Sequence, residues 1–295
     1  MGGVHWTLDL LSHFHVQYLG FGLGALLLAV LGRARWAAVV ALLVSILAGQ
    51  AVAPLWGSPG QSADTGGPSA RLVALNVLTT NREHGDVTQW LLQQNADVIV
   101  AQEVDERWAR ALDSALDGHR RLPTDTLRSD NFGIAIYVAE GWGAEDPTVH
   151  WTELELPWLE VVIHRGDLDL RVFGVHTIPP IGARNYRSRG EQLMAAVTAA
   201  ASSPEPALIA GDFNATIWSS ALREALDGQS LRPACLGSGL WGTWHSKLMF
   251  TGGILIDHVL VDERLAILSH RVGKHVGSDH RGIVVDVASP GARPR

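Results

Sequence analysis

The sequence predicts an α/β domain in which sheets and helices pack in layers, preceded by an apolar helical hairpin. Two uncharged, apolar stretches lie at residues 16–31 and 36–55. The rest of the chain alternates short apolar runs with turn residues, and the strand-like segments outnumber the helix-like ones. Most of these strand segments are apolar enough to be covered on both faces, which favours a layered sandwich of sheets and helices.

The apolar hairpin has the length of a membrane anchor. A bilayer core about 30 Å thick needs roughly 20 apolar helical residues. Residues 36–55 meet that length, and the first stretch meets it if its helix begins near His13, so we expect transmembrane helices at about 14–32 and 36–55. A buried hairpin of a soluble protein is the alternative, but these stretches carry too little polarity for the polar stripe of a soluble helix. Residues 1–14 are too polar for a third span.

Basic residues predict the orientation of the hairpin. Arg33 and Arg35, in the turn between the two stretches, are the only Lys or Arg before Arg71. The positive-inside rule places this turn in the cytoplasm and both flanks outside. Alternatively, the two arginines begin a signal peptide that is cleaved after residues 51–53, although Pro54 argues against cleavage. Either reading puts the following domain outside a bacterial-type cytoplasmic membrane.

The net charge of the chain indicates which partners the domain can bind. Residues 1–65 hold two basic and two acidic residues, so the rest of the chain carries the whole net charge of −7. Nucleic-acid binders usually present a basic surface, which makes a nucleic-acid partner less favoured.

Cys235 is the single cysteine. An exported domain with one thiol has no internal disulfide, so we expect Cys235 to be a small buried core residue.

The remaining elements follow in order along the chain. Residues 57–70 are dominated by Gly, Ser and Pro, which is typical of a flexible linker. Residues 86–94 suit a helix because Asp86 is a good N-cap and apolar residues follow at helical spacing. A second helix is expected at about 184–201. Strands are expected at residues 72–77, 97–101, 133–138, 159–164, 169–175, 206–210, 255–261 and 282–287.

Polar side chains recur where these apolar strands begin or end. Each one alone is as well explained by a turn, a cap or a satisfied surface position. The set, however, combines the hard oxygen ligands that Mg²⁺ prefers with imidazoles that can serve phosphoryl chemistry. Rigid strands hold such side chains in fixed positions. The set is Asn76, Glu103, His176, Asp212, Asn214, Asp257, Asp279 and His280.

These residues stand in ordered motifs that resemble the endonuclease/exonuclease/phosphatase superfamily, which includes type I deoxyribonuclease, neutral sphingomyelinases and inositol-polyphosphate 5-phosphatases. The motifs are N-V at 76–77, Q-E-V at 102–104, H-T at 176–177, G-D-F-N at 211–214, I-D-H-V at 256–259 and S-D-H-R at 278–281. The resemblance implies a four-layer α/β sandwich of the DNase I-like type. It divides the chain into an anchor at 1–56, a linker at 57–70, a catalytic domain at 71–288 and a tail at 289–295.

A narrower set of motifs resembles the bacterial membrane-anchored branch with the VanJ-type teicoplanin resistance proteins. It comprises DNFGIAI at 130–136, HTIPP at 176–180, GDFNATIWS at 211–219 and GTW at 242–244. That branch usually has three spans, whereas two are clear here. Gly282 and His245 stand where the branch commonly has proline, and the second departure falls in a substrate loop.

The superfamily resemblance implies a metal site and a substrate groove. Glu103 would be the main metal carboxylate, with Asn76 beside it and Asp279 as a second carboxylate on the metal side. The implied cofactor is Mg²⁺ or Mn²⁺, in agreement with these oxygen donors. Asn81 and Asn131 are candidates for the substrate groove, and ordinary loop hydrogen bonding explains each of them equally well.

The same resemblance implies the roles of the reacting groups. Asp212 would orient or deprotonate the attacking water, and Asn214 would hold that water or a phosphate oxygen. His280, paired with Asp257, would contact the scissile phosphate. His176 would donate to another non-bridging oxygen. Fixed donors and a cation stabilise the charge that phosphoryl transfer builds on oxygen, without a protein nucleophile.

Three functions are compatible with these expectations. The first is a Mg²⁺-dependent phosphohydrolase that cleaves a lipid-linked phosphate ester or pyrophosphate, with the bilayer as its partner and no obligate protein partner evident. The second is an exported, membrane-bound nuclease, which the same catalytic residues would serve. The third is a non-catalytic binding protein of the same fold, which the intact set of carboxylates and histidines disfavours.

Overall fold

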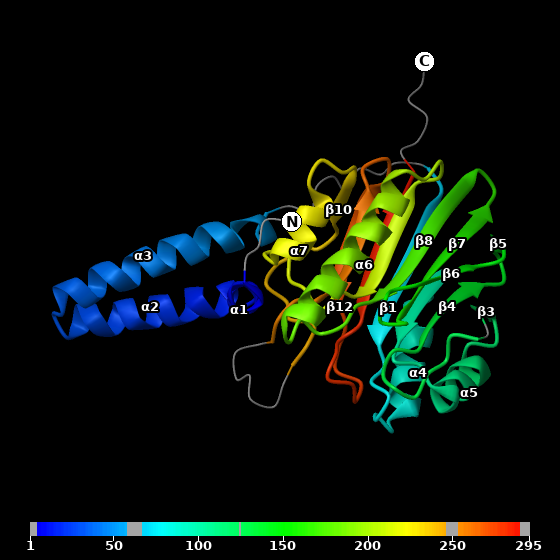
Figure 1. Ribbon diagram of the computed structural model, residues 1–295, viewed down its shortest axis with the longest axis horizontal. Coiled ribbons are helices and arrows are strands. Elements are labelled where there is room, and N and C mark those ends of the chain that lie inside the picture. The colour runs from blue at the N-terminus through cyan, green and yellow to red at the C-terminus, as the bar shows by residue number, and fades with distance from the viewer. Residues whose placement is uncertain (1–4, 58–66, 124, 246–252, 290–295) are drawn as a thin grey trace, which may run out of the picture.

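Two β-sheets face each other in the folded domain of the computed structural model, which describes residues 5–57, 67–123, 125–245 and 253–289 (Figure 1). The six-stranded sheet has the order β12-β13-β1-β2-β4-β3. Its strands are β1 (Ser69–Asn76), β2 (Val98–Gln102), β3 (His119–Leu122), β4 (Ile134–Ala139), β12 (Ala266–Val272) and β13 (Ile283–Ala288). Only β1 and β2 run parallel; its other described pairs are antiparallel.

The seven-stranded sheet has the order β10-β11-β9-β8-β7-β5, with β6 paired to β7. Its strands are β5 (Gly143–Ala144), β6 (Thr148–Trp151), β7 (Pro157–Arg165), β8 (Leu168–His176), β9 (Ala207–Asp212), β10 (Leu231–Pro233) and β11 (Asp257–Asp262). Strands β8 and β9 are parallel neighbours, and β11 pairs antiparallel with β9. Each sheet therefore has one parallel pair near its centre.

Helices cover the outer face of each sheet and complete four layers. Alternate residues of a strand point to opposite faces. In β1, Leu72 and Ala74 thus pack between the sheets, whereas Val73 and Leu75 pack against α4 (His84–Gln94) and α5 (Glu106–Ala115). On the other sheet, α6 (Ala183–Ala201) and α7 (Ser220–Leu226) bury their apolar faces against β8 and β9. The predicted layered α/β sandwich, with strands covered on both faces, is confirmed.

The predicted strands and both predicted helices are present, with small shifts at their ends. The first strand starts at Ser69, so Ser69 and Ala70, expected in the linker, belong to the sheet. Helix α4 starts at His84, two residues before the expected N-cap Asp86, which lies in its first turn. Residues 58–66 of the expected linker and residues 290–295 of the expected tail lie outside the described residues.

A helical hairpin projects from one end of the sandwich (Figure 1). It consists of a short α1 (Trp6–Ser12), then α2 (His15–Leu31) and α3 (Arg35–Val52), with a 3-10 turn η1 (Ala53–Leu55) after α3. The two long helices lie side by side, and Gly22 is required at their contact because a Cβ there would come within 2.7 Å of the Ser45 hydroxyl. Among the described residues, the helix Arg35–Leu55 is long and apolar enough to cross a membrane. Helices α1 and α2 meet this criterion only when the pair, bent by 64°, is counted as one span.

Both ends of the hairpin dock directly on the sandwich. At the start, Asp9 of α1 forms an ion pair with Arg189 of α6 at 2.5 Å, and both side chains are fully buried. At the other end, the Trp218 indole donates to the carbonyl of Ala51 at 2.8 Å. Leu55 packs in a small apolar cluster with Cys235, which is buried as predicted. The hairpin is therefore a packed part of the fold rather than a helix pair held only by the chain that follows it.

Candidate active site

The predicted polar residues meet at one end of the two sheets. Residue Asn76 ends β1, His176 ends β8 and Asp212 ends β9, while Asp257 begins the antiparallel strand β11. The strand register pairs Asp212 with both His176 and Asp257. Across the sandwich, the amide of Asn76 reaches Asp212 at 3.2 Å, so the site is shared by both sheets.

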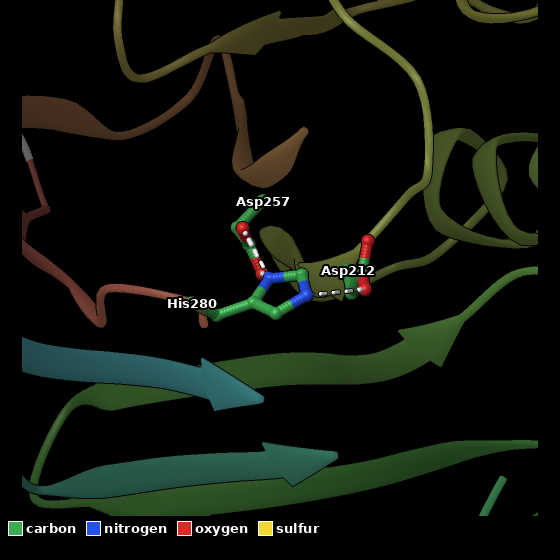
Figure 2. A group of neighbouring side chains, drawn as sticks. All are labelled: Asp212, Asp257 and His280. Carbon is green, nitrogen blue, oxygen red and sulfur yellow. Dashed lines mark hydrogen bonds and ion pairs between the residues drawn. The ribbon is translucent and has the colours of Figure 1, made fainter. Parts of the chain in front are cut away.

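A histidine between two carboxylates forms the centre of this group (Figure 2). The Nδ1 atom of His280 lies 2.9 Å and 3.0 Å from the two carboxylate oxygens of Asp257, and its Nε2 lies 3.6 Å from Oδ2 of Asp212. Burial alone would lower the pKa of His280, but the charges of Asp257 and Asp212 outweigh burial and raise it to about 10. The imidazole is therefore held as a cation whose orientation Asp257 fixes.

The carboxylate of Asp212 is the most connected acid of the site. Its Oδ1 accepts the backbone N–H of Asn214 at 2.9 Å, and its Oδ2 accepts from the amide of Asn76. Burial raises the pKa of Asp212 to about 7, against the opposing effect of the nearby His280 cation. The side chain of Asn214 in turn donates to the carbonyl of Thr177 at 2.8 Å, which fixes the loop that follows β9.

Glu103 lies beside this group in a strained backbone conformation. Its Oε1 accepts from the amide of Asn76 at 3.0 Å, and its Oε2 accepts the backbone N–H of Thr79 at 2.9 Å. The φ angle of Glu103 is +60°, and Asn131 and Asn214, which line the same pocket, also have positive φ angles of +71° and +45°. Non-glycine residues in this region are strained, and such residues concentrate at functional sites.

The donor set of the pocket fits a divalent cation. Glu103, Asp212 and Asp279 all line the pocket, and Asp257 lies directly behind His280. One oxygen of Asp279 accepts from the indole of Trp244 at 3.0 Å, whereas its Oδ1 is buried and has no hydrogen-bond partner in the described part of the chain. A buried carboxylate oxygen without a partner is favourable when a cation compensates it, so Asp279 is open to a metal ligand role. Oxygen donors of this kind suit Mg²⁺ or Mn²⁺.

Two sets of side chains can contribute to such a site. By distance alone, Asp212, Asp257 and His280 place ligand atoms within 4.8 Å of one another. However, Nδ1 of His280 is already engaged by Asp257, and a protonated imidazole has no lone pair for a metal. The carboxylate oxygens of Glu103 and Asp279, by contrast, have lone pairs that can bind a metal. Asn76 uses its oxygen to accept the backbone N–H of Leu78 at 3.0 Å and its amide to hold Glu103, so here it positions a carboxylate.

His176 faces the same centre as a neutral imidazole. Burial lowers its pKa to about 3, and the positive charge of His280 acts in the same direction. Its Nε2 lies 3.6 Å from Oδ2 of Asp212, and its Nδ1 is buried with no partner among the described residues. The ring of Phe132 packs on it with a centroid distance of 5.1 Å. A neutral imidazole retains one N–H, which is the donor that the predicted role requires.

The G-T-W motif supports these groups, a role that sequence reasoning did not assign. The hydroxyl of Thr243 accepts the backbone N–H groups of Ile256 and Asp257, both at 3.1 Å, and so fixes the start of β11. The next residue, Trp244, donates to Asp279. The motif thus holds two acids of the site in place, Asp257 and Asp279.

The two substrate-groove candidates differ in position. Asn131 lines the pocket. Asn81 is not among the described lining residues, and its side chain instead bonds backbone groups: its amide donates to the carbonyls of Val77 and Val276, and its oxygen accepts the N–H of Glu83. The structure therefore gives Asn81 ordinary loop hydrogen bonds. His258, the neighbour of Asp257 in β11, bonds the carbonyl of Ala215 on the opposite face of the strand.

The cavity in front of these residues has a volume of about 490 Å³. Its lining combines polar side chains, among them the acids and histidines described above, with apolar ones. The apolar lining comprises Leu10, Phe14, Phe132, Pro179, Pro180, Ile181, Trp244, Ile254 and Ile256. Leu10 and Phe14, together with His13, come from the segment before α2, which sequence reasoning did not connect with the site. The available signal was Asp9, the only acidic residue before Asp64.

Comparison with solved structures identifies the same fold in other proteins. Truncated TDP2 from Caenorhabditis elegans superposes with a TM-score of 0.63 at 15% identity, over 75% of this chain and 98% of that one. An endonuclease/exonuclease/phosphatase protein from Bacteroides vulgatus gives 0.63 at 15% identity, over 75% and 99%. TDP2 from D. rerio, complexed with a single-strand DNA product, gives 0.62 at 14% identity, over 75% and 99%. At these identities the likeness establishes the fold alone.

Sequence comparison extends this result from fold to family. No curated protein matches the sequence. A sequence model of the Endonuclease/Exonuclease/phosphatase family, however, matches residues 73–280, from the middle of β1 to the histidine of the His280–Asp257 pair. Because this match spans most of the chain and contains every predicted catalytic and metal residue, the protein belongs to the endonuclease/exonuclease/phosphatase family.

Proposed function

We propose that the protein is a membrane-anchored, divalent-metal-dependent phosphohydrolase that cleaves a lipid-linked phosphate ester or pyrophosphate at the outer face of the cytoplasmic membrane. The observation that carries this proposal is the composition of one cavity. Asp212 and His280 line it, and Leu10 and Phe14, immediately before the apolar hairpin, form part of its wall. A phosphate attached to a hydrocarbon chain matches this combination of polar and apolar side chains.

The outer surface of the hairpin supports a membrane location. Leu28, Leu31 and Trp36 are 70%, 71% and 84% exposed, which is unfavourable in water and favourable in lipid. The 21 residues from Arg35 to Leu55 span roughly 30 Å as a helix, about the thickness of the bilayer core, and the last turn of this length docks on the sandwich. Trp36 and Trp56 flank this length, as in the aromatic belts of membrane proteins. With Arg33 and Arg35 in the cytoplasm, the sandwich lies outside.

The reaction we propose is attack of water on phosphorus with cleavage of the P–O bond to the leaving group. A divalent cation held by Glu103 and Asp279 would supply positive charge to the phosphoryl oxygens. Asp212, fixed by the N–H of Asn214, accepts the proton of the attacking water. Nε2 of His280, aimed by Asp257, donates to a phosphoryl oxygen, and His176 donates to another.

The choice of a lipid substrate rests on charge and on the narrower resemblance. None of the described residues that line the cavity is Lys or Arg. Nucleic-acid affinity comes largely from such cations, so the cavity is poorly suited to a polynucleotide. The motifs shared with the VanJ-type branch favour a lipid-linked pyrophosphate, by analogy. A nuclease is the second candidate, because the structurally similar D. rerio TDP2 is complexed with a DNA product.

A substrate panel tests this proposal. Purified full-length protein in detergent, with Mg²⁺, is assayed against a prenyl pyrophosphate, a phospholipid and plasmid DNA. We expect phosphate release from a lipid substrate and little cutting of plasmid. Efficient plasmid cleavage without lipid turnover would reject the lipid hypothesis and favour the nuclease. No turnover of any substrate with Mg²⁺ or Mn²⁺ would favour a binding protein.

A reporter pair tests the orientation. Alkaline phosphatase fused after Arg295 should be active, because that enzyme matures outside the cytoplasm. A fluorescent protein that matures only in the cytoplasm should stay dark at the same position. The opposite pair of results would place the sandwich inside.

A further inference from the structure

We propose that the segment before α2 is the substrate-selecting wall of the active site. In this proposal, Leu10 and Phe14 form an apolar subsite with Pro180 and Ile181 that holds the first part of the hydrocarbon chain next to the scissile phosphate. The ion pair of Asp9 with Arg189 keeps the wall in place. The inference rests on the proposed lipid-phosphate function and assigns the specificity to named residues.

A single guanidinium connects this wall to the catalytic loop. Arg189 binds Asp9 through one nitrogen and donates from the other to the carbonyl of Asn214 at 2.7 Å. Asp9 also accepts the backbone N–H of Ser220 at 2.7 Å and its hydroxyl at 2.8 Å. Breaking a fully buried ion pair leaves an uncompensated charge, so the helix α1 is held firmly against the sandwich.

His13 provides a second connection two residues beyond Asn214. Its Nδ1 lies 3.0 Å from the hydroxyl of Thr216 and accepts the backbone N–H of Thr216 at 3.2 Å. The residue is buried and lines the cavity between Leu10 and Phe14. A third bond, from the side chain of Gln17 to the carbonyl of Gly253, fixes the first turn of α2. The wall is therefore positioned by the catalytic domain itself.

The position of the wall determines which leaving groups fit. Leu10 and Phe14 present hydrocarbon, so a sugar or nucleoside packed on these two side chains would lose hydrogen bonds to water that they cannot replace. An alkyl or prenyl chain would instead gain from leaving water. Phe14 is the N-cap residue of α2, so a chain that passes it continues along the exposed apolar surface of the hairpin, where lipid would lie.

Butyl and octyl phosphate test the wall directly, with wild-type protein, Leu10→Ala, Phe14→Ala and the control Leu28→Ala. The control removes a leucine from α2 that is 70% exposed and is not among the described lining residues. We expect Phe14→Ala and Leu10→Ala to raise KM for octyl phosphate by about tenfold and KM for butyl phosphate by less than about twofold. Leu28→Ala should leave KM for both substrates at the wild-type value. Because it is measured in the same detergent, it also controls for partition of the longer substrate into the micelles.

Binding of non-hydrolysable phosphonates separates this inference from the proposed function. Wild-type protein should bind octylphosphonate more tightly than methylphosphonate by calorimetry, and Phe14→Ala should remove most of that difference. If wild type shows no preference for the longer phosphonate, or if Phe14→Ala retains the full preference, the wall does not select the chain. A Phe14-dependent preference without turnover of any alkyl phosphate would uphold the wall and reject the hydrolase.

Discussion

The amide nitrogen of Asn76 donates to both Glu103, at 3.0 Å, and Asp212, at 3.2 Å. One neutral side chain therefore joins the carboxylate that we place on the metal to the carboxylate that we place on the water. Its own orientation is fixed, because its oxygen accepts the backbone N–H of Leu78.

This geometry predicts that Asn76→Asp is more harmful than Asn76→Ala. Alanine removes all three of these hydrogen bonds, whereas aspartate adds a third acid between two others and repels both. We expect kcat to fall on the order of 10²-fold for Asn76→Ala and further for Asn76→Asp. Steady-state kinetics over a Mg²⁺ titration would check this, and an Asn76→Asp enzyme as active as Asn76→Ala would contradict the bridging role.

Asp212→Asn and His280→Ala each remove a group that contacts the reacting atoms in our account. Each should lower kcat by on the order of 10³-fold or more, while the circular dichroism spectrum stays that of the wild type. His258→Gln is the matched control for the histidine, because His258 bonds a backbone carbonyl on the opposite face of β11. A variant that keeps more than about a tenth of the wild-type rate would remove that residue from the mechanism.

Metal removal should abolish activity reversibly. Glu103 and Asp279 offer oxygen donors without a sulfur ligand, so weakly held Mg²⁺ should leave in excess EDTA and return when Mg²⁺ is added. Phosphate release before and after dialysis measures this. Full turnover in excess EDTA would contradict a metal-assisted reaction.

The buried pair Asp9–Arg189 should contribute to stability as well as to the pocket. Asp9→Ala leaves the Arg189 charge buried without its partner, which typically costs about 3–5 kcal/mol. The double change Asp9→Leu with Arg189→Met removes both charges and should recover most of that loss. The unfolding temperatures of the single and the double variant in detergent, each compared with that of the wild type, measure these two effects. Equal stability of Asp9→Ala and wild type would show that α1 is not held by this pair.

Much of the sandwich was predictable because local patterns determine it. An apolar run such as VIVAQ is typical of a strand in a sheet that is covered on both faces. This run ends in a polar residue, which the strand holds in a fixed position. The group of polar residues that we propose as catalytic could therefore be predicted from the order of the motifs. Helix α5 was missed because its ten residues bury only Trp108, Ala109 and Leu112 among many charges, although Asp105 caps it by accepting the N–H of Trp108.

The wall at Leu10 and Phe14 could not be predicted from local pattern. Polar residues in the first fourteen positions indicate only that this segment does not span a membrane. Its role depends on the contact between Asp9 and Arg189, which lie 180 positions apart and belong to different parts of the predicted domain organisation. A lone acid in a segment with no other Asp, Glu, Lys or Arg suggests a buried partner, but the sequence does not identify which of the later arginines it is.

Release of phosphate from a lipid pyrophosphate in liposomes distinguishes a lipid-phosphate hydrolase from a nuclease. Full-length protein is reconstituted with a prenyl pyrophosphate and Mg²⁺, and the products are followed by phosphorus NMR, with Asp212→Asn as the control. We expect steady release of inorganic phosphate by the wild type and almost none by Asp212→Asn. A wild-type protein that leaves the lipid pyrophosphate intact while cutting plasmid DNA under the same conditions would contradict this expectation.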